Sequence, residues 1–433
     1  MRRPAVCCAV LVVLSVLAGC SLPSIGPSTP DPNEGLGYEA GYNATDSLPV
    51  TTGDGLNASE RDAVLARTMA RVEEVRGLEF EETVTVELVT REEYQSGDAG
   101  TPGAGERALV NQRWEALFTV GEDADATAAY DTVFGDSVVG FYSNGRIVIV
   151  SDSETPTLDT RTLAHELLHA LQDQHLGFGP RTPTFDGSRA REGLVEGDAN
   201  YVESLYSERC ESEWDCLARP DGPDAPGSFN RGIYQAIIQP YVDGPAFVRA
   251  IHDRGGWEAV NDAYEQFPDS TEQTIHPARY PDEPVADVTV ADESADDWTR
   301  LGRDPPTDRL GEVGVYTMLQ TNGVLEDHQR YDYSHPASTG WAGDQLVPYR
   351  NAETGESAYV WRLAWDSEGD AREFVGAYRD LLTSKNATRP AGDVYVVPSG
   401  PYADAFRVTR DGATVTVVNA PTRADLDAVH GSG

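Results

Sequence analysis

Residues 162–177 contain two histidines four positions apart, His165 and His169, with Glu166 directly after the first. Apolar residues with helical spacing predict that this segment is a helix, and they are Leu163, Leu167, Leu168 and Leu171. Because residues four apart leave the same face of a helix, both imidazoles can reach one metal ion, at about 2.0–2.1 Å for zinc. Zinc lowers the pKa of a water molecule that it binds to about 7, and Glu166 is placed to accept a proton from that water. The alternative is a helix with two histidines on its surface.

Two histidines need at least one further protein ligand to hold zinc. The next segment, 189–206, also has helical apolar spacing, and it contains Glu192, Glu196 and Asp198. Glu192 and Glu196 are four residues apart, so both share a helix face and the spacing permits either as the third ligand. Asp198 is expected on the helix surface or behind a ligand. Asp173 could accept a hydrogen bond from a ligand imidazole without contacting the metal itself, or it could face solvent.

The two segments read AHELLHALQDQH and GLVEGDA. Together they resemble a group of bacterial and haloarchaeal surface proteins with the motifs H-E-L-x-H-A-L-Q-D-Q and A-L-V-E-G-D-A. Those proteins are similar to gluzincin-type zinc metallopeptidases, whose third zinc ligand is a glutamate on the helix after the H-E-x-x-H helix. The resemblance implies zinc as the cofactor, held by His165, His169 and Glu196, with Glu166 as the general base. It favours Glu196 because Glu192 has no counterpart in the motif.

The resemblance also implies an α+β fold with a zincin-like core, in which a mixed sheet accompanies the H-E-x-x-H helix above a mostly helical lower half. Residues 137–152 fit this fold, since Asn144-Gly145 between two alternating segments predicts a β-hairpin. Either Gly140–Ser143 or Arg146–Val150 would then pair with the backbone of an extended peptide, unless the hairpin is only structural. A smaller α+β region is expected at the C-terminus.

Residues 270–280, STEQTIHPARY, resemble a T-E-Q-x-x-H-P-x-x-Y segment of the same proteins. In gluzincin peptidases a histidine or tyrosine from this side of the cleft stabilises the oxyanion that forms on the scissile carbonyl. The resemblance therefore implies that His276 or Tyr280 has this role, and we take His276 as the candidate catalytic residue. The alternative is a histidine that ends a loop before Pro277.

The chain of 433 residues has 72 acidic and 33 basic residues, which gives a formal net charge of −39. Lys385 is the single lysine. A surface this acidic would repel phosphate, so the composition excludes a nucleic-acid-binding protein. The acids are spread along the whole chain, which favours adaptation to molar salt, where counterions screen the repulsion.

The N-terminus has the features of an export signal. Arg2-Arg3 precede an apolar segment, 5–17, that is too short to span a bilayer. Leu17-Ala18-Gly19-Cys20 looks like a lipobox, which predicts cleavage before Cys20 and a lipid on its sulfur; an ordinary signal peptide is the alternative. A lipid would anchor the protein to the outer face of the cell membrane. In that oxidising compartment, Cys210 and Cys216 are expected to form a disulfide.

These observations divide the chain into a signal peptide (1–19), a flexible tether (20–55), a zincin-like catalytic domain (56–284), a linker (285–305) and a C-terminal α+β region (306–433). Within the catalytic domain, residues 79–90 are predicted to be a strand and 229–267 a largely helical segment. The functional hypothesis is a lipid-anchored zinc metallopeptidase that hydrolyses a peptide or protein substrate. The alternative is a non-catalytic zinc-containing surface lipoprotein that binds peptide or metal or maintains the envelope.

Overall fold

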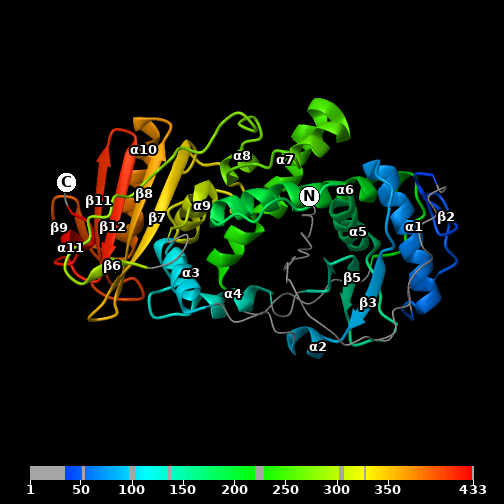
Figure 1. The fold of residues 1–433 in the computed structure, drawn as a ribbon, viewed down its shortest axis with the longest axis horizontal. Helices are drawn as coiled ribbons and strands as arrows, with labels where there is room; N and C mark the ends of the chain where they lie inside the picture. The colour runs from blue at the N-terminus through cyan, green and yellow to red at the C-terminus, as the bar shows by residue number, and fades with distance from the viewer. Residues whose placement is uncertain are drawn as a thin grey trace.

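The protein is a mixed α+β structure, as the sequence predicts, in a computed structural model that describes residues 35–50, 54–96, 103–134, 138–153, 155–219, 229–301, 307–325 and 328–431. Figure 1 shows an elongated molecule with a small sheet near one end, a large sheet at the other, and helices between them. The helices are α1 (Ala58–Arg76), α2 (Arg91–Ser96), α3 (Ala104–Ala116), α4 (Ala126–Phe134), α5 (Thr160–His175), α6 (Phe185–Ser212), α7 (Arg231–Ala263), α8 (Thr271–Ile275), α9 (Gly311–Thr321), α10 (Glu368–Ser384) and α11 (Leu426–Val429). Within the described residues, none of these helices is both long and apolar enough to cross a membrane.

The small sheet has the strand order β3-β5-β4 and accompanies helix α5. Its strands are β3 (Thr85–Val89), β4 (Gly140–Ser143) and β5 (Arg146–Val150). The predicted hairpin is confirmed, with Asn144 and Gly145 at φ values of 49° and 79° in its turn. Since β5 pairs with β3 on one side and β4 on the other, Arg146–Val150 has no free edge for a peptide. Of the two predicted peptide-binding strands, only β4 lies at an edge of the described sheet.

Strand β3 is shorter than the predicted strand over residues 79–90. Side chains bind the backbone of the residues before it: Glu73 accepts from the amide of Phe80, and Gln174 accepts from the amides of Glu81 and Glu82. Amides held in this way by α1 and α5 do not join a strand ladder. The alternation of apolar and polar residues therefore predicts a longer strand, 79–90, than the Thr85–Val89 strand that forms.

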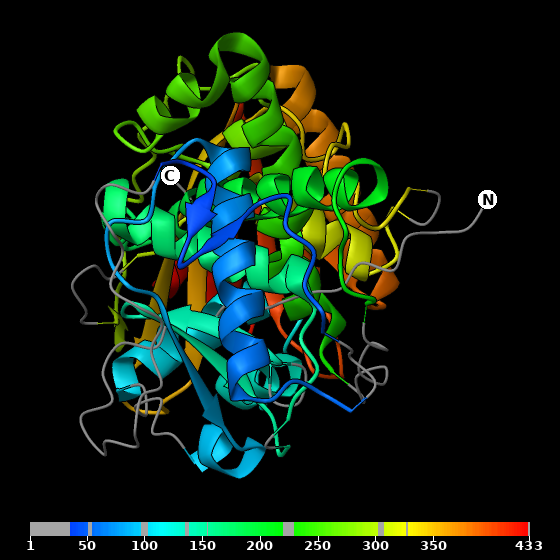
Figure 2. The same ribbon diagram turned by 90° about the vertical axis from the view of Figure 1, so that its right-hand side faces the viewer.

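The predicted tether, 20–55, is ordered where the structure describes it. Strands β1 (Tyr38–Glu39) and β2 (Tyr42–Asn43) form a hairpin beside α1, which Figure 2 shows from the α1 side. Ala44 and Leu48 are buried in the same apolar cluster as α1 and α5. Burial of these side chains holds this part of the predicted tether against the helix. The predicted signal peptide and the lipidation site Cys20 lie outside the described residues.

The large sheet is antiparallel throughout, with the strand order β6-β7-β8-β12-β11-β10-β9. Its strands are β6 (Trp298–Arg300), β7 (Trp341–Asn351), β8 (Ser357–Trp365), β9 (Thr388–Ala391), β10 (Val394–Val396), β11 (Ala405–Asp411) and β12 (Thr414–Ala420). Strand β6 lies inside the predicted linker, 285–305. It is part of the sheet because the side chain of Trp298 is buried and the strand pairs with β7. This part of the chain is a structural element of the sheet.

The core of the large sheet extends across the predicted domain boundary. Trp114 of α3 and Leu117, the C-cap of that helix, belong to the same buried cluster as Trp361 of β8 and Tyr378 of α10. The ring of Phe118, just after α3, lies 6.1 Å from that of Tyr378. Residues on both sides of the predicted linker therefore share one hydrophobic core.

Helices α6 and α7 cross where two glycines meet, Gly197 and Gly244. A Cβ atom on Gly197 would lie 2.5 Å from the carbonyl oxygen of Gly244, which is closer than real Cβ contacts. The sequence predicts breaks in this segment at Pro240, Gly244-Pro245 and Gly255-Gly256. Helix α7 continues through both prolines, and only the break at Gly255 and Gly256 is confirmed. The close crossing places α7 directly behind the turn of α6 that contains Glu196.

We expect the substitution Gly197→Ala to destabilise the protein by about 1–3 kcal/mol, because the added methyl group must push the two helix backbones apart. Gly376→Ala in α10 is the matched control: a Cβ there meets no atom within 4 Å, so alanine should be neutral or stabilise the helix by up to about 1 kcal/mol. Thermal unfolding in molar salt measures both. Equal unfolding temperatures for the two variants would contradict the close crossing.

Candidate metal centre

Helix α5 presents His165, Glu166 and His169 from a firmly buried segment. The four leucines of its apolar stripe are at most 5% exposed, and Asp159 caps the N-terminus by accepting from the amide of Arg161. The three polar side chains are also buried, at 1–2% exposure. Because the leucines fix the rotation of the helix, the imidazoles point toward α6, where Glu196 is 3% exposed.

The donor atoms of His165, His169 and Glu196 form a nearly equilateral triangle. The distance between the two histidine Nε2 atoms is 3.2 Å, and Glu196 Oε2 lies 3.3 Å and 3.5 Å from those of His165 and His169. Zinc with ligands at about 2.0–2.1 Å in tetrahedral geometry requires donors about 3.3–3.4 Å apart. Two imidazoles and one carboxylate with this spacing fit a zinc ion that keeps one coordination position open.

Glu192, the other candidate ligand, has a different partner. Its Oε1 atom lies 2.5 Å from a guanidinium nitrogen of Arg189, one turn earlier on α6. Burial raises the pKa of the Glu192 carboxyl, and the charge of Arg189 lowers it. The structure therefore brings Glu196, and not Glu192, to the two histidines.

The side chains around the three donors favour a positive charge at the centre. Burial acts to raise the pKa of Glu196, but His169 and His165 hold it at about 2. Burial acts to lower the pKa of His165, while the neighbouring carboxylates of Glu196 and Glu203 raise it to about 10. The carboxylates of Glu196 and Glu203 both face the imidazole of His165, and such surroundings favour a divalent cation between the donor atoms.

Glu166 is held by the edge strand of the small sheet. Its Oε2 atom accepts from the backbone amide of Tyr142 in β4, at 2.9 Å. Its Oε1 atom is buried and has no hydrogen-bond partner among the residues that the structure describes. Burial raises the pKa of the carboxyl, whereas His165 and His169 lower it. One oxygen is thus fixed by the protein backbone, and the other is free to accept a proton.

Two polar side chains that the sequence patterns do not single out contact the candidate ligands from behind. Gln172 Oε1 lies 2.7 Å from His169 Nδ1, and Glu203 Oε2 lies 3.6 Å from His165 Nδ1. Asp173, considered for the role that Gln172 has, instead accepts from the hydroxyl of Tyr142 at 2.6 Å. Gln172 could have been found from sequence, because it lies three residues after His169 and so shares its helix face.

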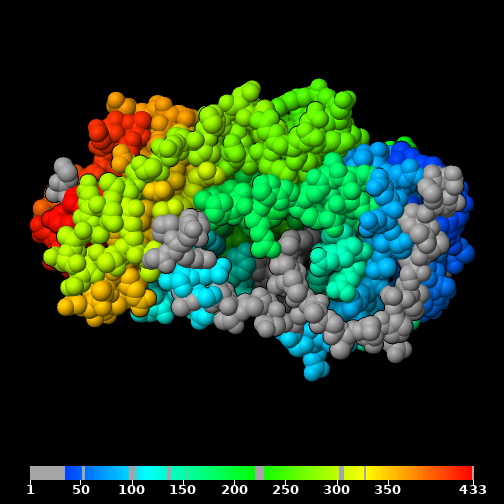
Figure 3. Space-filling model, in the orientation of Figure 1, coloured from blue at the N-terminus to red at the C-terminus, as the bar shows by residue number. Residues whose placement is uncertain are grey.

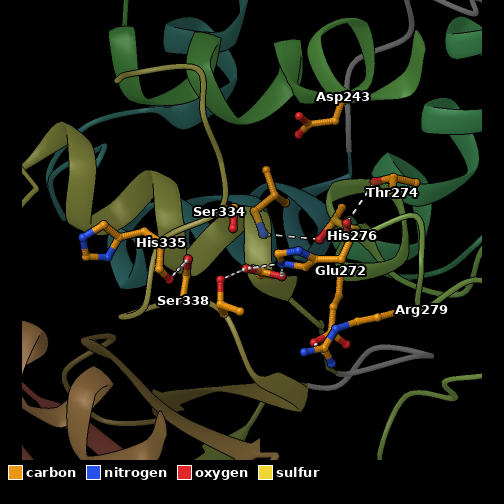
Figure 4. Close-up of polar contacts among 12 residues, drawn as sticks. Asp243, Glu272, Thr274, His276, Arg279, Ser334, His335 and Ser338 are labelled. Atoms are coloured by element: carbon orange, nitrogen blue, oxygen red, sulfur yellow. Dashed lines mark hydrogen bonds and ion pairs between the residues drawn. The ribbon is translucent and has the colours of Figure 1, made fainter. Parts of the chain in front are cut away.

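His276 is not part of this group. Its Nε2 atom lies 3.0 Å from Glu312 of α9, in a second polar cluster with Asp243, Glu272 and Arg279 (Figure 4). Tyr280, the other candidate, donates its hydroxyl to the backbone carbonyl of Gln266. The structure thus gives both residues partners other than the candidate zinc ligands.

The second polar cluster also contains three carboxylates close enough to hold an ion, from Glu272, Glu283 and Asp366. One guanidinium nitrogen of Arg279 already lies 2.8, 2.5 and 2.9 Å from them. Burial and the charge of Glu312 raise the pKa of Glu272 to about 9. Because Arg279 supplies the positive charge, this cluster is an ion-pair network and not a second metal centre.

The sulfur atoms of Cys210 and Cys216 are bonded to each other at 2.07 Å, just after the metal centre along the chain. Cys210 lies in the last turn of α6, and the bridge closes the loop that follows the helix. The pair that the sequence suggests for a disulfide is thus bonded in the structure.

Comparison with known proteins finds a family match for one region of the chain. Residues 299–430 match a family described as a domain of unknown function (DUF8575). Neither the curated proteins nor the solved structures include a match to this chain. The matched region covers the large sheet together with α9, α10 and α11, and it does not include the candidate metal centre.

Proposed function

We propose that this protein is a zinc metallopeptidase of gluzincin type, anchored to the outer face of the cell membrane by a lipid on Cys20. The observation that supports it most is the triangle of donor atoms from His165, His169 and Glu196, next to a carboxylate with one free oxygen. A metal that only braced a fold would not need Glu166 beside it.

Each residue has a role in this proposal. His165, His169 and Glu196 would hold zinc, which would supply Lewis-acid activation of a water molecule. Glu166 accepts a proton from the attacking water at Oε1 and passes it to the leaving amine. The contact from the Tyr142 amide to Oε2 keeps the carboxylate oriented for both transfers. The proposal assigns no role to His276, whose Nε2 atom contacts Glu312.

The edge strand β4 is the proposed binding site for substrate backbone. In its ladder with β5, Phe141 pairs with Val148 and Tyr142 with Ile147. The amide of Tyr142 points to Glu166, away from β5, so its carbonyl faces the same free edge. An extended peptide can pair with this edge and pass close to Glu166. Figure 3 shows α6 in the middle of one face of the molecule, between α1 and the large sheet.

A second candidate is a zinc-binding surface lipoprotein without catalytic activity. Burial favours it, because the three proposed ligands and Glu166 are only 1–3% exposed and a substrate needs access to the metal. Both candidates share the zinc site and the anchor. They differ in whether the free oxygen of Glu166 meets a substrate.

The test is peptide cleavage in molar salt by the full-length protein, purified in detergent and loaded with zinc. We expect mass spectrometry of a peptide library to show new termini, which disappear when a chelator removes the metal and return when zinc is added. Zinc bound at one equivalent without any cleavage would favour the second candidate. Absence of bound zinc would reject both.

A further inference from the structure

A continuous row of buried hydrogen bonds leads from the candidate metal centre to helix α1. It begins at His169, whose Nδ1 atom lies 2.7 Å from Gln172 Oε1. Gln172 Nε2 lies 2.7 Å from the hydroxyl oxygen of Tyr264, which in turn lies 2.9 Å from Asp198 Oδ2. The row ends at Arg76 of α1, whose guanidinium holds both oxygens of Asp198 at 3.1–3.2 Å.

All four residues behind His169 are secluded from solvent. Gln172, Asp198 and Arg76 are 0% exposed, and Tyr264 is 6% exposed. They come from four helices or helix ends: α5, α6, α1 and the C-terminal cap of α7. Arg76 is further fixed by the ring of Trp257, whose centroid lies 4.5 Å from its guanidinium carbon. Buried polar groups that are hydrogen-bonded to one another hold their neighbours in place, so each member of the row restricts the next.

The chemistry of the end groups gives the row a direction. Arg76 can only donate and an ionised Asp198 can only accept, so the hydroxyl of Tyr264 donates its proton to Asp198. The oxygen of Tyr264 then accepts from Gln172 Nε2, which also donates to the carbonyl of Val195 at 2.9 Å. The amide oxygen of Gln172 is thereby left to face His169, and it accepts a hydrogen bond from the N–H group at Nδ1. A neutral imidazole with its proton on Nδ1 has a free electron pair on Nε2, the atom that faces Glu196.

We propose that Tyr264, Asp198 and Arg76 are positioning residues of the metal centre, which act through Gln172 to fix the tautomer and ring orientation of His169. This inference rests on the proposed zinc site. It assigns a function in zinc binding to α1 and to the end of α7, which contribute none of the proposed ligands. Gln172 also helps to position Glu196. Its hydrogen bond to the carbonyl of Val195, the residue directly before Glu196, joins α5 to the backbone of α6.

The substitution Tyr264→Phe tests the proposal, since it removes only the hydroxyl that joins Gln172 to Asp198. Tyr280→Phe is the matched control: Tyr280 belongs to the same apolar cluster, is 8% exposed, and loses a single hydrogen bond to the carbonyl of Gln266. We expect Tyr264→Phe to weaken zinc binding by about 10-fold or more, as is typical for partners of metal-ligating histidines. Tyr280→Phe should bind zinc within about twofold of the unmodified protein.

Two measurements separate positioning from stability. Competition with a chromophoric chelator gives the zinc affinity, and thermal unfolding of the zinc-free protein gives the cost of each lost hydroxyl. A merely structural role would lower the zinc-free unfolding temperature in both variants and leave their zinc affinities alike. That result, obtained while the unmodified protein binds zinc tightly, overturns the inference. Failure of the unmodified protein to bind zinc would instead reject the proposed function.

Gln172→Met provides a second test, since it removes the acceptor of the His169 proton and keeps the size of the side chain. We expect a loss of zinc affinity of about 10- to 100-fold, at least as large as that of Tyr264→Phe. The visible spectrum of the cobalt-substituted protein should change in both variants, because the ring of His169 is no longer fixed. Unchanged affinity and spectrum in Gln172→Met would contradict the first link and, with it, the whole row.

Discussion

Replacing His169 with alanine should remove stoichiometric zinc from the protein. Zinc bound by four ligands contributes about 10–16 kcal/mol of binding free energy, so each ligand accounts for about 3–4 kcal/mol. The expected loss of affinity is therefore on the order of 10²- to 10³-fold. Metal analysis of the purified variant after dialysis measures it, and we expect far less than one zinc per chain.

The matched control is His175→Ala on the same helix. His175 lies near the C-terminus of α5, where its Nε2 atom is 2.7 Å from the backbone carbonyl of Glu79, away from the metal centre. A second pair has the same design on α6: Glu196→Gln should lose zinc, whereas Glu192→Gln should keep it because Glu192 pairs with Arg189. If the two members of either pair retain zinc equally, the proposed ligand set is wrong.

Bound zinc should also stabilise the folded protein, because its proposed ligands lie on two helices, α5 and α6, and the ion joins them. A ligand at about 1,000 times its dissociation constant stabilises the folded state by about 4 kcal/mol. A chelator should therefore lower the unfolding temperature of the unmodified protein and leave that of His169→Ala unchanged. An equal effect on both proteins would place the stabilising ion elsewhere.

The histidine pair was predictable because its geometry is local. The spacing of His165 and His169 and the leucine stripe of α5 together specify one helix with both rings on one face. The third ligand was not determined by spacing, since Glu192 and Glu196 share a face. The sequence did contain a signal that distinguishes them, because Arg189 stands three residues before Glu192, at a spacing that favours an ion pair.

The groups behind the ligands could not be predicted because they come from distant parts of the chain. Arg76 and Tyr264 reach Asp198 from α1 and from the end of α7, and no local pattern links these positions. The same reason applies to His276, whose partner Glu312 is 36 residues further on. The acidic composition of residues 285–305 predicts a linker, but the side chain of Trp298 is buried and its strand pairs with β7. A single buried aromatic residue is not visible in an average over composition.

Glu166→Gln should abolish peptide hydrolysis and retain zinc. Glutamine has the same shape, and its amide oxygen can still accept from the amide of Tyr142, so the fold and the ligands should be preserved. It cannot accept a proton from water, and loss of a general base typically costs 10²- to 10⁴-fold in rate. Rates of peptide cleavage in molar salt, together with metal analysis, measure the two effects separately.

Glu192→Gln is the control for this substitution also, because it removes a half-buried carboxylate one turn before Glu196 that contacts Arg189 and none of the proposed ligands. It should keep both zinc and activity. Equal cleavage rates for Glu166→Gln and the unmodified protein would exclude Glu166 as the base. If neither protein cleaves any peptide while both bind one zinc, the free oxygen of Glu166 has no catalytic use, and the non-catalytic zinc lipoprotein becomes the better account of the site.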